Sequence, residues 1–281
     1  MTPFFSIIIP TFNSEKTLDE TLKSVSLQSM RDFELIISDG ASTDKTIKIA
    51  ESFITKIPQV TISSKPDSGV YDAVNKAIEI ASGKWIFILG SDDQLATDDI
   101  LKTTAEYLKK TAEPFAYGNV LVRGNSSLLH EGQIYDGEFT VEKILQKNIC
   151  QQAIFYRRDI FSSLGNFNTR YRTCADWDFA LRAAANFNLY YMPITISIFS
   201  ATGLSSNNKD LVFNKDRLFL IIRYFRLKSL RKDFIFIRWE YYDFAKELFK
   251  KRQFFMGISA YLIYVIIGIN SKIASKNRQK T

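Results

Sequence analysis

The first 83 residues alternate between short apolar runs and stretches with helical periodicity. The apolar runs are four to six residues long, as expected of strands buried on both faces of a sheet. Between them, apolar residues recur at helical spacing, as at Leu18, Leu22 and Val25. The pattern predicts strands at 5–9, 33–38, 60–63 and 84–89, and helices at 14–28, 43–54 and 69–81.

Strands separated by helices of about a dozen residues predict a parallel sheet with right-handed crossovers. After Pro114 the elements become shorter and more mixed. The expected fold class is therefore α/β, with a mixed, mainly parallel sheet flanked by helices. In such sheets ligands bind beyond the carboxyl ends of the strands. The predicted later elements are strands at 115–122, 153–156, 189–192 and 195–199 and a helix at 176–186.

The chain changes character near residue 205, where an aromatic and basic helical tail begins. From Ser205 onward 17 Lys and Arg stand against 6 Asp and Glu, a net charge of +11, whereas the 20 and 24 of the first 204 residues give −4. We therefore expect a domain at 1–204 and a helical basic tail at 205–281. Such asymmetry indicates a polyanionic partner for the tail, either an anionic membrane or nucleic acid.

Residues 253–271 carry no formal charge, and Lys and Arg flank them on both sides. At about 1.5 Å per residue this run barely reaches across a hydrocarbon core of about 30 Å. Positive flanks on both sides favour a helix that lies in the membrane interface. A core helix or a dimer helix is the alternative.

Several classes of site are excluded by what the chain lacks. His130 is the only histidine, so a zinc cluster of Cys and His is impossible, and Cys150 and Cys174 cannot form a disulfide framework. Neither a P-loop nor a dinucleotide-binding Gly-x-Gly-x-x-Gly segment follows a predicted strand. The N-terminus shows no basic region or cleavage site typical of a signal peptide, so we expect a cytoplasmic protein.

Acidic residues gather instead where the predicted strands end. The adjacent carboxylates of Asp92 and Asp93 can share a ribose hydroxyl and a divalent cation, because Mg²⁺ and Mn²⁺ prefer oxygen ligands. A helix cap or a turn is the alternative explanation for such a pair. The acidic residues at the strand ends are Asp39, Asp44, Asp67, Asp72, Asp92 and Asp93.

Four segments in this order resemble the opening of family-2 inverting glycosyltransferases with the GT-A fold. The resemblance covers about residues 4–200, and the four segments together are specific. It implies a nucleotide-sugar donor and a divalent cation, Mn²⁺ or Mg²⁺. The segments are SIIIPTFN (6–13), ISDGASTDKT (37–46), GVYDAVNK (69–76) and ILGSDD (88–93).

The resemblance also implies roles for individual residues. Thr11 and Asn13 would line the nucleotide loop, and Asp39 would read the base, usually uracil. Asp92 would hold the ribose or the metal, and Asp93 would be the metal ligand.

Asp72 and Lys76 lie one helical turn apart, hence on one face of a helix. Lys76 would approach the donor diphosphate. An ion pair on a solvated face is the alternative.

The second half supplies the candidate base. Residues 174–182 resemble the family's acidic motif, with Ala175 in place of its first acid, so that Asp176 aligns with the base that takes the acceptor's proton. Asp176 as a helix N-cap is the alternative, and Asp178 is expected to orient Arg182 by i,i+4 pairing.

Two departures from the family pattern limit what is expected. Gln151 stands where relatives often have histidine, which puts an imidazole role there in doubt. The processive-synthase segment Gln-x-x-Arg-Trp is absent, because Ile235 replaces its glutamine, so repeated addition is disfavoured.

The sequence thus predicts metal-dependent, inverting transfer of a single sugar, from a UDP-sugar by preference, to a hydroxyl of a glycan or lipid-linked saccharide. We expect the enzyme to act in surface polysaccharide synthesis on the inner face of a cell membrane, with peripheral contact through its tail. A sugar nucleotidyltransferase is one alternative. A nucleic-acid-binding protein is the other, although we expect no nucleic acid partner because the tail's charges lie beside a long apolar run.

Overall fold

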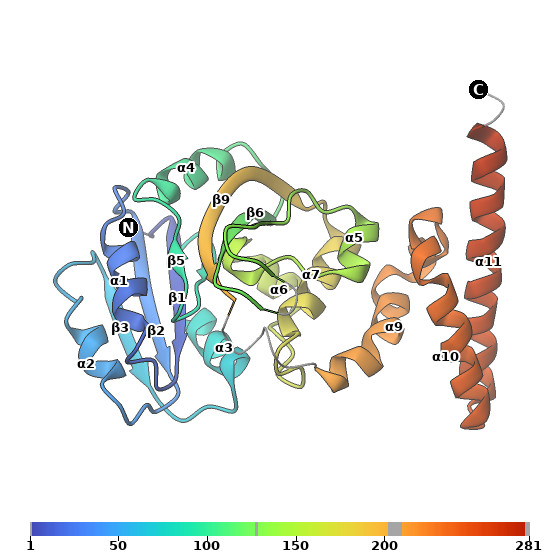
Figure 1. The fold of residues 1–281 in the computed structure, drawn as a ribbon, viewed down its shortest axis with the longest axis horizontal. Helices are drawn as coiled ribbons and strands as arrows, with labels where there is room; N and C mark the ends of the chain where they lie inside the picture. The colour runs from blue at the N-terminus through green and yellow to red at the C-terminus, as the bar shows by residue number, and fades with distance from the viewer. Residues whose placement is uncertain (1, 127–128, 202–209, 279–281) are drawn as a thin grey trace. The chain divides into compact units, whose positions relative to one another are not determined.

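The structure, a computed structural model, describes residues 2–126, 129–201 and 210–278 (Figure 1). It divides into two compact units, of which unit 1 comprises Met1–Phe139 and Asn148–Asp210 and unit 2 comprises Thr140–Lys147 and Leu211–Thr281. The boundary predicted after residue 204 lies outside the described residues. No pattern in the sequence indicated that residues 140–147 belong with the C-terminal unit.

Unit 1 contains a nine-stranded mixed sheet with the strand order β3-β2-β1-β4-β8-β6-β9-β5, and β7 pairs with β6. The first four strands pair in parallel, so all four carboxyl ends lie at one edge of the sheet. These strands are β1 (Phe5–Thr11), β2 (Phe33–Asp39), β3 (Val60–Ser64) and β4 (Trp85–Ile88).

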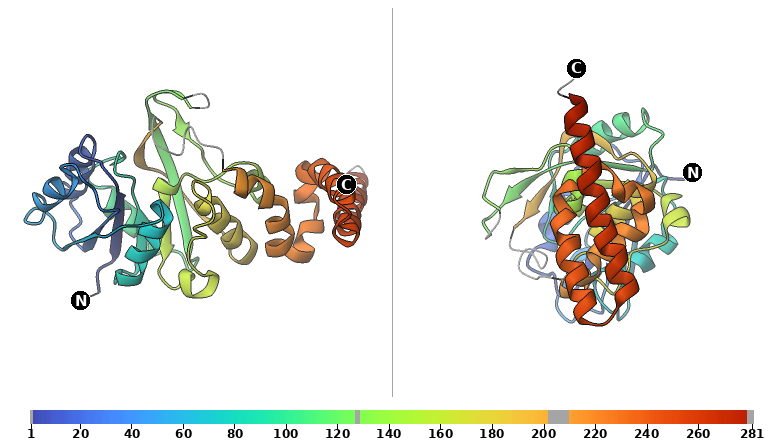
Figure 2. Two further views of the ribbon diagram at one scale, coloured as in Figure 1. Left: turned by 90° about the horizontal axis from the view of Figure 1, so that it is seen from below. Right: turned by 90° about the vertical axis from the view of Figure 1, so that its right-hand side faces the viewer.

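Three helices connect these strands, and Figures 1 and 2 show α1 and α2 on one face of the sheet and α3 on the other. Two of them begin later than predicted. Ser14 lies in a turn and accepts the amides of Thr17 and Leu18 through its carbonyl, and Asp44 accepts the amide of Thr46 at 2.9 Å before the next helix. The helices are α1 (Leu18–Ser26), α2 (Thr46–Glu51) and α3 (Val70–Ile80).

The second half of unit 1 pairs mostly antiparallel, which confirms a mixed α/β fold. Its elements are β5 (Gln94–Leu95), α4 (Ile100–Leu108), β6 (Phe115–Arg123), β7 (Ile134–Tyr135), η1 (Gln151–Ala153), β8 (Ile154–Arg157), α6 (Ile160–Leu164), α7 (Ala175–Asn186) and β9 (Tyr190–Ser200).

The prediction of separate strands at 189–192 and 195–199 was wrong. One strand, β9, runs through Pro193, and its pairing with β6 shifts register between Tyr117 and Asn119. Such an irregularity accommodates a proline, which cannot donate to the ladder.

The core of unit 1 lies on both faces of the sheet. Phe5, Ile7, Leu35 and Phe87 are completely or almost completely buried, and the ring of Phe87 stacks on Phe155 at 4.6 Å between centroids. The middles of these strands are apolar on both sides, so their polar side chains lie near the strand ends. Thr11, Ser38 and Asp39 lie at the carboxyl ends of β1 and β2, whereas Ser6 and Glu34 pair at the amino ends.

Unit 2 is helical and ends in a hairpin of two antiparallel helices (Figure 2). Small residues let the two helices approach closely: a Cβ on Gly257 would lie 2.8 Å from the ring of Phe249. Its elements are α5 (Val141–Gln146), α9 (Leu211–Phe225), η2 (Arg226–Leu230), η3 (Lys232–Ile237), α10 (Arg238–Lys250) and α11 (Phe254–Arg278).

Candidate active site

The carboxylate of Asp39 connects the ends of three parallel strands. It accepts hydrogen bonds from the hydroxyls of Thr11 (2.9 Å) and Ser64 (2.6 Å) and from both the hydroxyl and the amide of Ser42. Burial raises the pKa of this carboxyl, but the four hydrogen bonds outweigh burial and hold its pKa below the ordinary value. A carboxylate has about four acceptor positions, so all are used within the protein. That Asp39 reads the base stays a prediction; in the structure it organises the loops.

Asn13 holds the loops after β1 and β2 together. Its side-chain oxygen accepts the amide of Thr43 at 2.9 Å, and its own amide donates to the hydroxyl of Ser42 at 2.8 Å. Between Thr11 and Asn13, the side chain of Phe12 is 65% exposed. An exposed aromatic ring at the carboxyl end of a strand can stack on a nucleobase. Phe12 was not among the predicted site residues, although a large aromatic residue between two polar ones was a usable signal.

The pair Asp92–Asp93 follows β4 in a tight turn. Asp93 is completely buried, and its Oδ1 accepts the amide of Ser200 at 2.8 Å, whereas its Oδ2 has no hydrogen-bond partner. A Cβ on Gly90 would lie 2.3 Å from this Oδ2 and 3.1 Å from Oδ1 of Asp92. Only glycine leaves room there, and the two carboxylates share the space beside its α-carbon.

Electrostatics make this pair unfavourable as it stands. Burial, followed by the negative charge of Asp92, raises the pKa of Asp93 to about 7, and burial also raises the pKa of Asp92. Two adjacent carboxylates, of which Asp93 keeps one oxygen without a hydrogen-bond partner, form a site that attracts a cation.

Asp176 is the second residue of α7 and is 7% exposed. Its carboxylate accepts hydrogen bonds from the Asn148 amide group (2.8 Å), the Tyr71 hydroxyl and the Trp177 amide (2.9 Å). Burial raises its pKa to about 6 in spite of these bonds. The N-cap interpretation was wrong, because α7 begins at Ala175 with Cys174 as its N-cap residue.

Residues 148–152 connect the two groups of carboxylates. Asn148 donates to Asp176 at one end of this segment, and the side chain of Gln152 donates to Asp93 at the other. Between them, the pKa of the Cys150 thiol is raised by burial and by the charges of both Asp93 and Asp176. The candidate metal pair and the candidate base therefore flank one short stretch of chain.

Gln151 takes no part in this connection. Its Oε1 accepts the Tyr156 hydroxyl at 3.2 Å, and its Nε2 is buried without a hydrogen-bond partner.

The predicted pairing of Asp178 with Arg182 is confirmed, at 2.9 Å with Asp178 only 1% exposed. Arg182 also donates to the carbonyls of Leu164 (2.6 Å) and Asn166 (3.0 Å). Asp178 thus fixes the Arg182 guanidinium, which joins α7 to the end of α6 and the segment after it.

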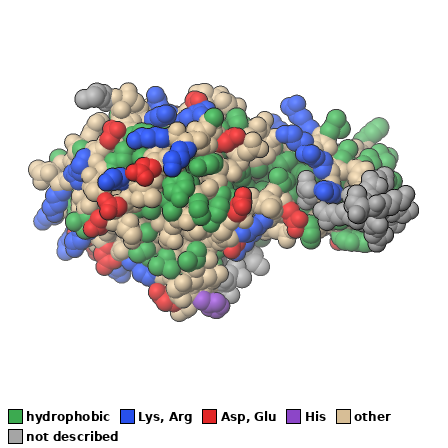
Figure 3. Space-filling view, turned by 90° about the horizontal axis from the view of Figure 1, so that it is seen from above, with side chains coloured by type: hydrophobic (Ala, Val, Ile, Leu, Met, Phe, Trp, Pro, Cys, Tyr) green, Lys and Arg blue, Asp and Glu red, His purple; other side chains and the backbone are tan. Residues whose placement is uncertain are grey.

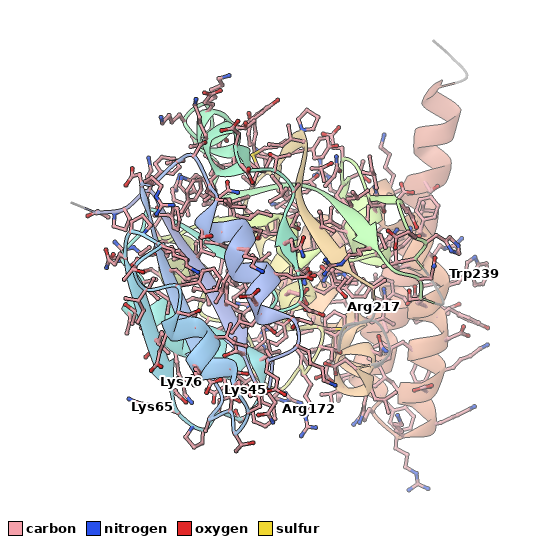
Figure 4. The ribbon with its side chains drawn as sticks, turned by 60° about the vertical axis from the view of Figure 1, so that its left-hand side comes forward. Lys45, Lys65, Lys76, Arg172, Arg217 and Trp239 are labelled. Atoms are coloured by element: carbon pink, nitrogen blue, oxygen red, sulfur yellow. The ribbon has the colours of Figure 1, made fainter. Side chains whose placement is uncertain are left out.

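Asp72 and Lys76 share one face of α3, as predicted, and pair at 3.0 Å. The Lys76 ammonium also donates to the carbonyl of Pro66 at 3.1 Å. A hydrogen bond from the Ser68 amide, followed by one from Lys76, lowers the pKa of Asp72. Figure 4 shows Lys76 near Lys65 at one end of unit 1. Contact of Lys76 with a diphosphate stays a prediction.

A mixed sheet with carboxylates at the ends of β2 and β4 is the arrangement of a GT-A-like fold. In fold, the chain is similar to S. aureus TarS residues 1–349, with a TM-score of 0.62 over 99% of this chain and 92% of that one, at 18% identity. It is also similar to the mannosyltransferase PcManGT from Pyrobaculum calidifontis, whose structure holds GDP-Man and Mn²⁺, with a TM-score of 0.54 over 71% of this chain and 57% of that one, at 19% identity.

The sequence comparison identifies the family. The sequence model of the family described as glycosyl transferase family 2 matches residues 6–165, and the chain belongs to that family. It is 39% identical over 210 residues, 73% of this chain, to a "PGL/p-HBAD biosynthesis glycosyltransferase" of Mycobacterium tuberculosis, of which it covers 80%. It is 30% identical over 181 residues, 64% of this chain, to the chondroitin synthase of Pasteurella multocida, but covers only 19% of that protein.

Two residues at the candidate base carried a signal that the sequence analysis did not use. Tyr71 lies in the segment GVYDAVNK (69–76), and Asn148 lies three residues before Gln151, yet neither was given a role. A tyrosine one residue before Asp72, in the first turn of a helix that follows a strand end, was an available clue. Their contacts with Asp176 cross between distant parts of the chain, so spacing alone does not predict them.

Asp176 and Asp178 should respond oppositely to replacement by asparagine. The folded-state pKa of Asp176 lies above its unfolded value, so its contribution to stability is present below about pH 4 and is lost as the pH rises through about 6. At pH 7 its ionised form costs up to about 3 kcal/mol. Asp176→Asn should therefore be at least as stable as wild type at pH 7.

Asp178→Asn should lose about 3 kcal/mol, because it breaks a buried ion pair. Urea unfolding of both variants at pH 7 measures the difference. Equal losses for the two variants would contradict the assignment of Asp178 as the structural carboxylate and Asp176 as the functional one.

Proposed function

We propose that this enzyme transfers a single sugar, with inversion at the anomeric carbon, from a nucleotide sugar to a hydroxyl of a glycan or lipid-linked saccharide. The observation that carries this proposal is the arrangement of Asp92–Asp93 and Asp176 around residues 148–152. It supports a donor site and a base on either side of one reacting position. Chondroitin synthesis, the named function of one relative, supports an acceptor that carries sugar hydroxyls.

The donor we propose is a UDP-linked hexose or N-acetylhexosamine. Structures of TarS with UDP and with UDP-GlcNAc support a uridine nucleotide, although the PcManGT complex shows that this fold also takes a guanosine nucleotide. In this chain Phe12 would stack on the base. Thr11 and Asn13 would shape the loop around the nucleotide, with Asp39 fixing its conformation.

The residues present fit a divalent cation, Mn²⁺ or Mg²⁺, beside Asp92 and Asp93. The unpaired, buried Oδ2 of Asp93 and its raised pKa both mark an oxygen that lacks a positive partner. No group of three His, Cys, Asp or Glu that could hold a metal ion occurs among the described residues. Mg²⁺ is usually bound by one or two carboxylates together with substrate phosphates and water. When bound, the cation would stabilise the charge of the departing diphosphate.

Burial divides the roles of the two carboxylates. Asp92 is partly exposed, whereas Asp93 is completely buried and anchored to Ser200. We therefore place the ribose contact on Asp92, and propose that the cation is held by Asp92 together with the unpartnered Oδ2 of Asp93, the metal ligand that the resemblance implies.

Asp92→Asn should weaken Mn²⁺-dependent donor binding about tenfold or more, because it removes the accessible oxygen ligand. Asp93→Asn should also weaken it, and Asp98→Asn, an exposed carboxylate five residues further on, should not. Calorimetric titration of UDP with and without Mn²⁺ measures the effect. If both Asp92→Asn and Asp93→Asn bind UDP with an unchanged Mn²⁺ requirement, the cation lies elsewhere.

Asp176 would act as the general base. With a pKa of about 6 it is mostly ionised at neutral pH, yet basic enough to take the acceptor's proton as the hydroxyl attacks. Its hydrogen bonds from Asn148 and Tyr71 fix the carboxylate in one orientation. Attack opposite the departing diphosphate yields inversion.

Asp176→Asn should slow sugar transfer about 10²–10⁴-fold and leave donor binding nearly unchanged, because the amide cannot accept the proton. Single-turnover transfer and equilibrium UDP binding separate these effects. Transfer within a few-fold of wild type would show that Asp176 is not the base.

We also propose that the enzyme is cytoplasmic and peripheral on the inner face of the cell membrane, attached through unit 2. Within α11, Phe254–Ser271 is long and apolar enough to cross a membrane, and only 22% of that stretch is buried in the structure. Phe255, Ile258, Leu262 and Ile269 are at least half exposed and recur at helical spacing along one side. Figure 3 shows Lys and Arg side chains beside the hydrophobic ones of this unit.

The contacts of α11 with α10 favour a helix that lies in the interface. Arg238 of α10 donates to the Tyr264 carbonyl at 3.0 Å and lies 4.2 Å from the centroid of the Tyr264 ring. Crossing the bilayer with α10 attached would take that helix's six charged residues into hydrocarbon. Crossing alone would break the hairpin. Trp239 of α10, labelled in Figure 4, is 59% exposed and is a typical interface residue.

The double variant Phe255→Ser and Leu262→Ser should bind vesicles with anionic lipid at least about tenfold more weakly, because two large side chains no longer enter the bilayer. Leu227→Ser, also at a highly exposed apolar position but outside α11, is the control and should bind like wild type. Sedimentation with phosphatidylglycerol-containing vesicles measures both. Undiminished binding of the double variant would place the contact elsewhere.

A further inference from the structure

Tyr71 connects the donor half of unit 1 to the candidate base. It lies in the first turn of α3, and its hydroxyl donates to the Asp176 carboxylate, which belongs to α7. Its ring packs against Phe167 at 5.4 Å between centroids. Asn75, one turn further along α3, holds both backbone groups of Phe167 at 2.9 and 3.0 Å. The tyrosine is therefore fixed at its ring as well as at its hydroxyl.

The start of α3 is anchored beside the loop that follows β2. Asp67 accepts the amide of Gly69 at 2.9 Å through Oδ1. The other oxygen, Oδ2, lies so close to Gly40 that a Cβ there would be 2.6 Å from it. Any shift of this loop on donor binding would thus reach Tyr71 within one turn of helix.

The groups that face Asp176 on the neighbouring elements have their pKa values raised by burial and are neutral at pH 7. The charged groups nearby are engaged elsewhere. Arg182, on α7 itself, pairs with Asp178, whereas Asp93 lies near Cys150 and Asp210 near Cys174. The ionised form of Asp176 therefore depends on neutral hydrogen-bond donors, of which Tyr71 supplies the only hydroxyl among the described residues bonded to it. The facing groups are Tyr71 on α3, Tyr135 on β7, Tyr156 on β8, Cys150 before η1 and Cys174 before α7.

We infer that Tyr71 is a positioning residue whose hydroxyl fixes the Asp176 carboxylate in one orientation, stabilises its ionised form and links it to the donor-side loop. The inference rests on the proposed function in that Asp176 is taken as the base. Tyr71 acts through Asp176 and needs no contact with the substrate.

Tyr71→Phe removes one donor to the ionised carboxylate and keeps the ring. The pKa of Asp176 should rise from about 6 by about one unit, since a hydrogen bond to a charged group is of that strength. Tyr156→Phe is the matched control: it also deletes a buried hydroxyl facing Asp176, but one that donates to Gln151. It should leave the pKa of Asp176 unchanged.

The test is a carbon-13 NMR titration of the full-length protein labelled at the aspartate carboxyl carbons. The Asp176 resonance is the one missing from Asp176→Asn. A midpoint raised in Tyr71→Phe and unchanged in Tyr156→Phe supports the inference, and equal midpoints in wild type and Tyr71→Phe overturn it. The titration needs no donor or acceptor, so its result is independent of whether Asp176 proves to be the base.

A measurement on proteins that keep Tyr71 covers the case in which Tyr71→Phe does not fold. Ionisation of Asp176 should perturb the ultraviolet absorbance of its tyrosine partner with a midpoint of about 6 in wild type and in Tyr156→Phe, and this step should vanish in Asp176→Asn. Its persistence in Asp176→Asn overturns the inference. In transfer assays, Tyr71→Phe should shift the acidic limb of the kcat/KM profile upward by the same amount, with little change in donor KM.

Discussion

The hydrogen bonds that converge on the buried carboxylate of Asp39 hold the ends of β1, β2 and β3 in register, and the loops of the candidate donor site start at those ends. Parallel pairing brings the strand ends to one edge of the sheet, but the loops also need a common anchor. With all its acceptor positions filled and its pKa lowered, Asp39 gives that anchor at little electrostatic cost. The placement of Phe12 and Asn13 follows from it.

The other buried carboxylates of the site differ from Asp39 in that their pKa values are raised. Asp93 and Asp176 are buried with raised pKa values, and Asp93 keeps an oxygen without a partner. A protein that needed only stability would neutralise or expose such groups. Beside residues 148–152, a cation would satisfy the unpartnered oxygen of Asp93, and a proton from the acceptor would neutralise Asp176. The hydrogen bonds that Asp176 does receive come from neutral groups, which leaves it basic enough to take a proton.

The sequence was sufficient for the fold and for the list of acidic residues, because apolar runs and strand-end polarity are local signals. It missed what depends on distant contacts. The strands predicted at 189–192 and 195–199 are one strand, because the register shift beside Gly118 lets it continue through Pro193. Asp92 and Asp93 look alike in sequence, and only burial separates them. The donation of Tyr71 to Asp176 joins positions about a hundred residues apart, beyond the reach of periodicity.

The stereochemistry of the product tests the account most directly. A base at Asp176 and a departing diphosphate beside Asp92 require attack from the face opposite the leaving group, in one step. The anomeric configuration of the first-formed glycosidic bond, read from its NMR coupling constants, should therefore be opposite to that of the donor sugar. Retention of the donor's configuration would contradict a single in-line displacement and would require a different role for Asp176.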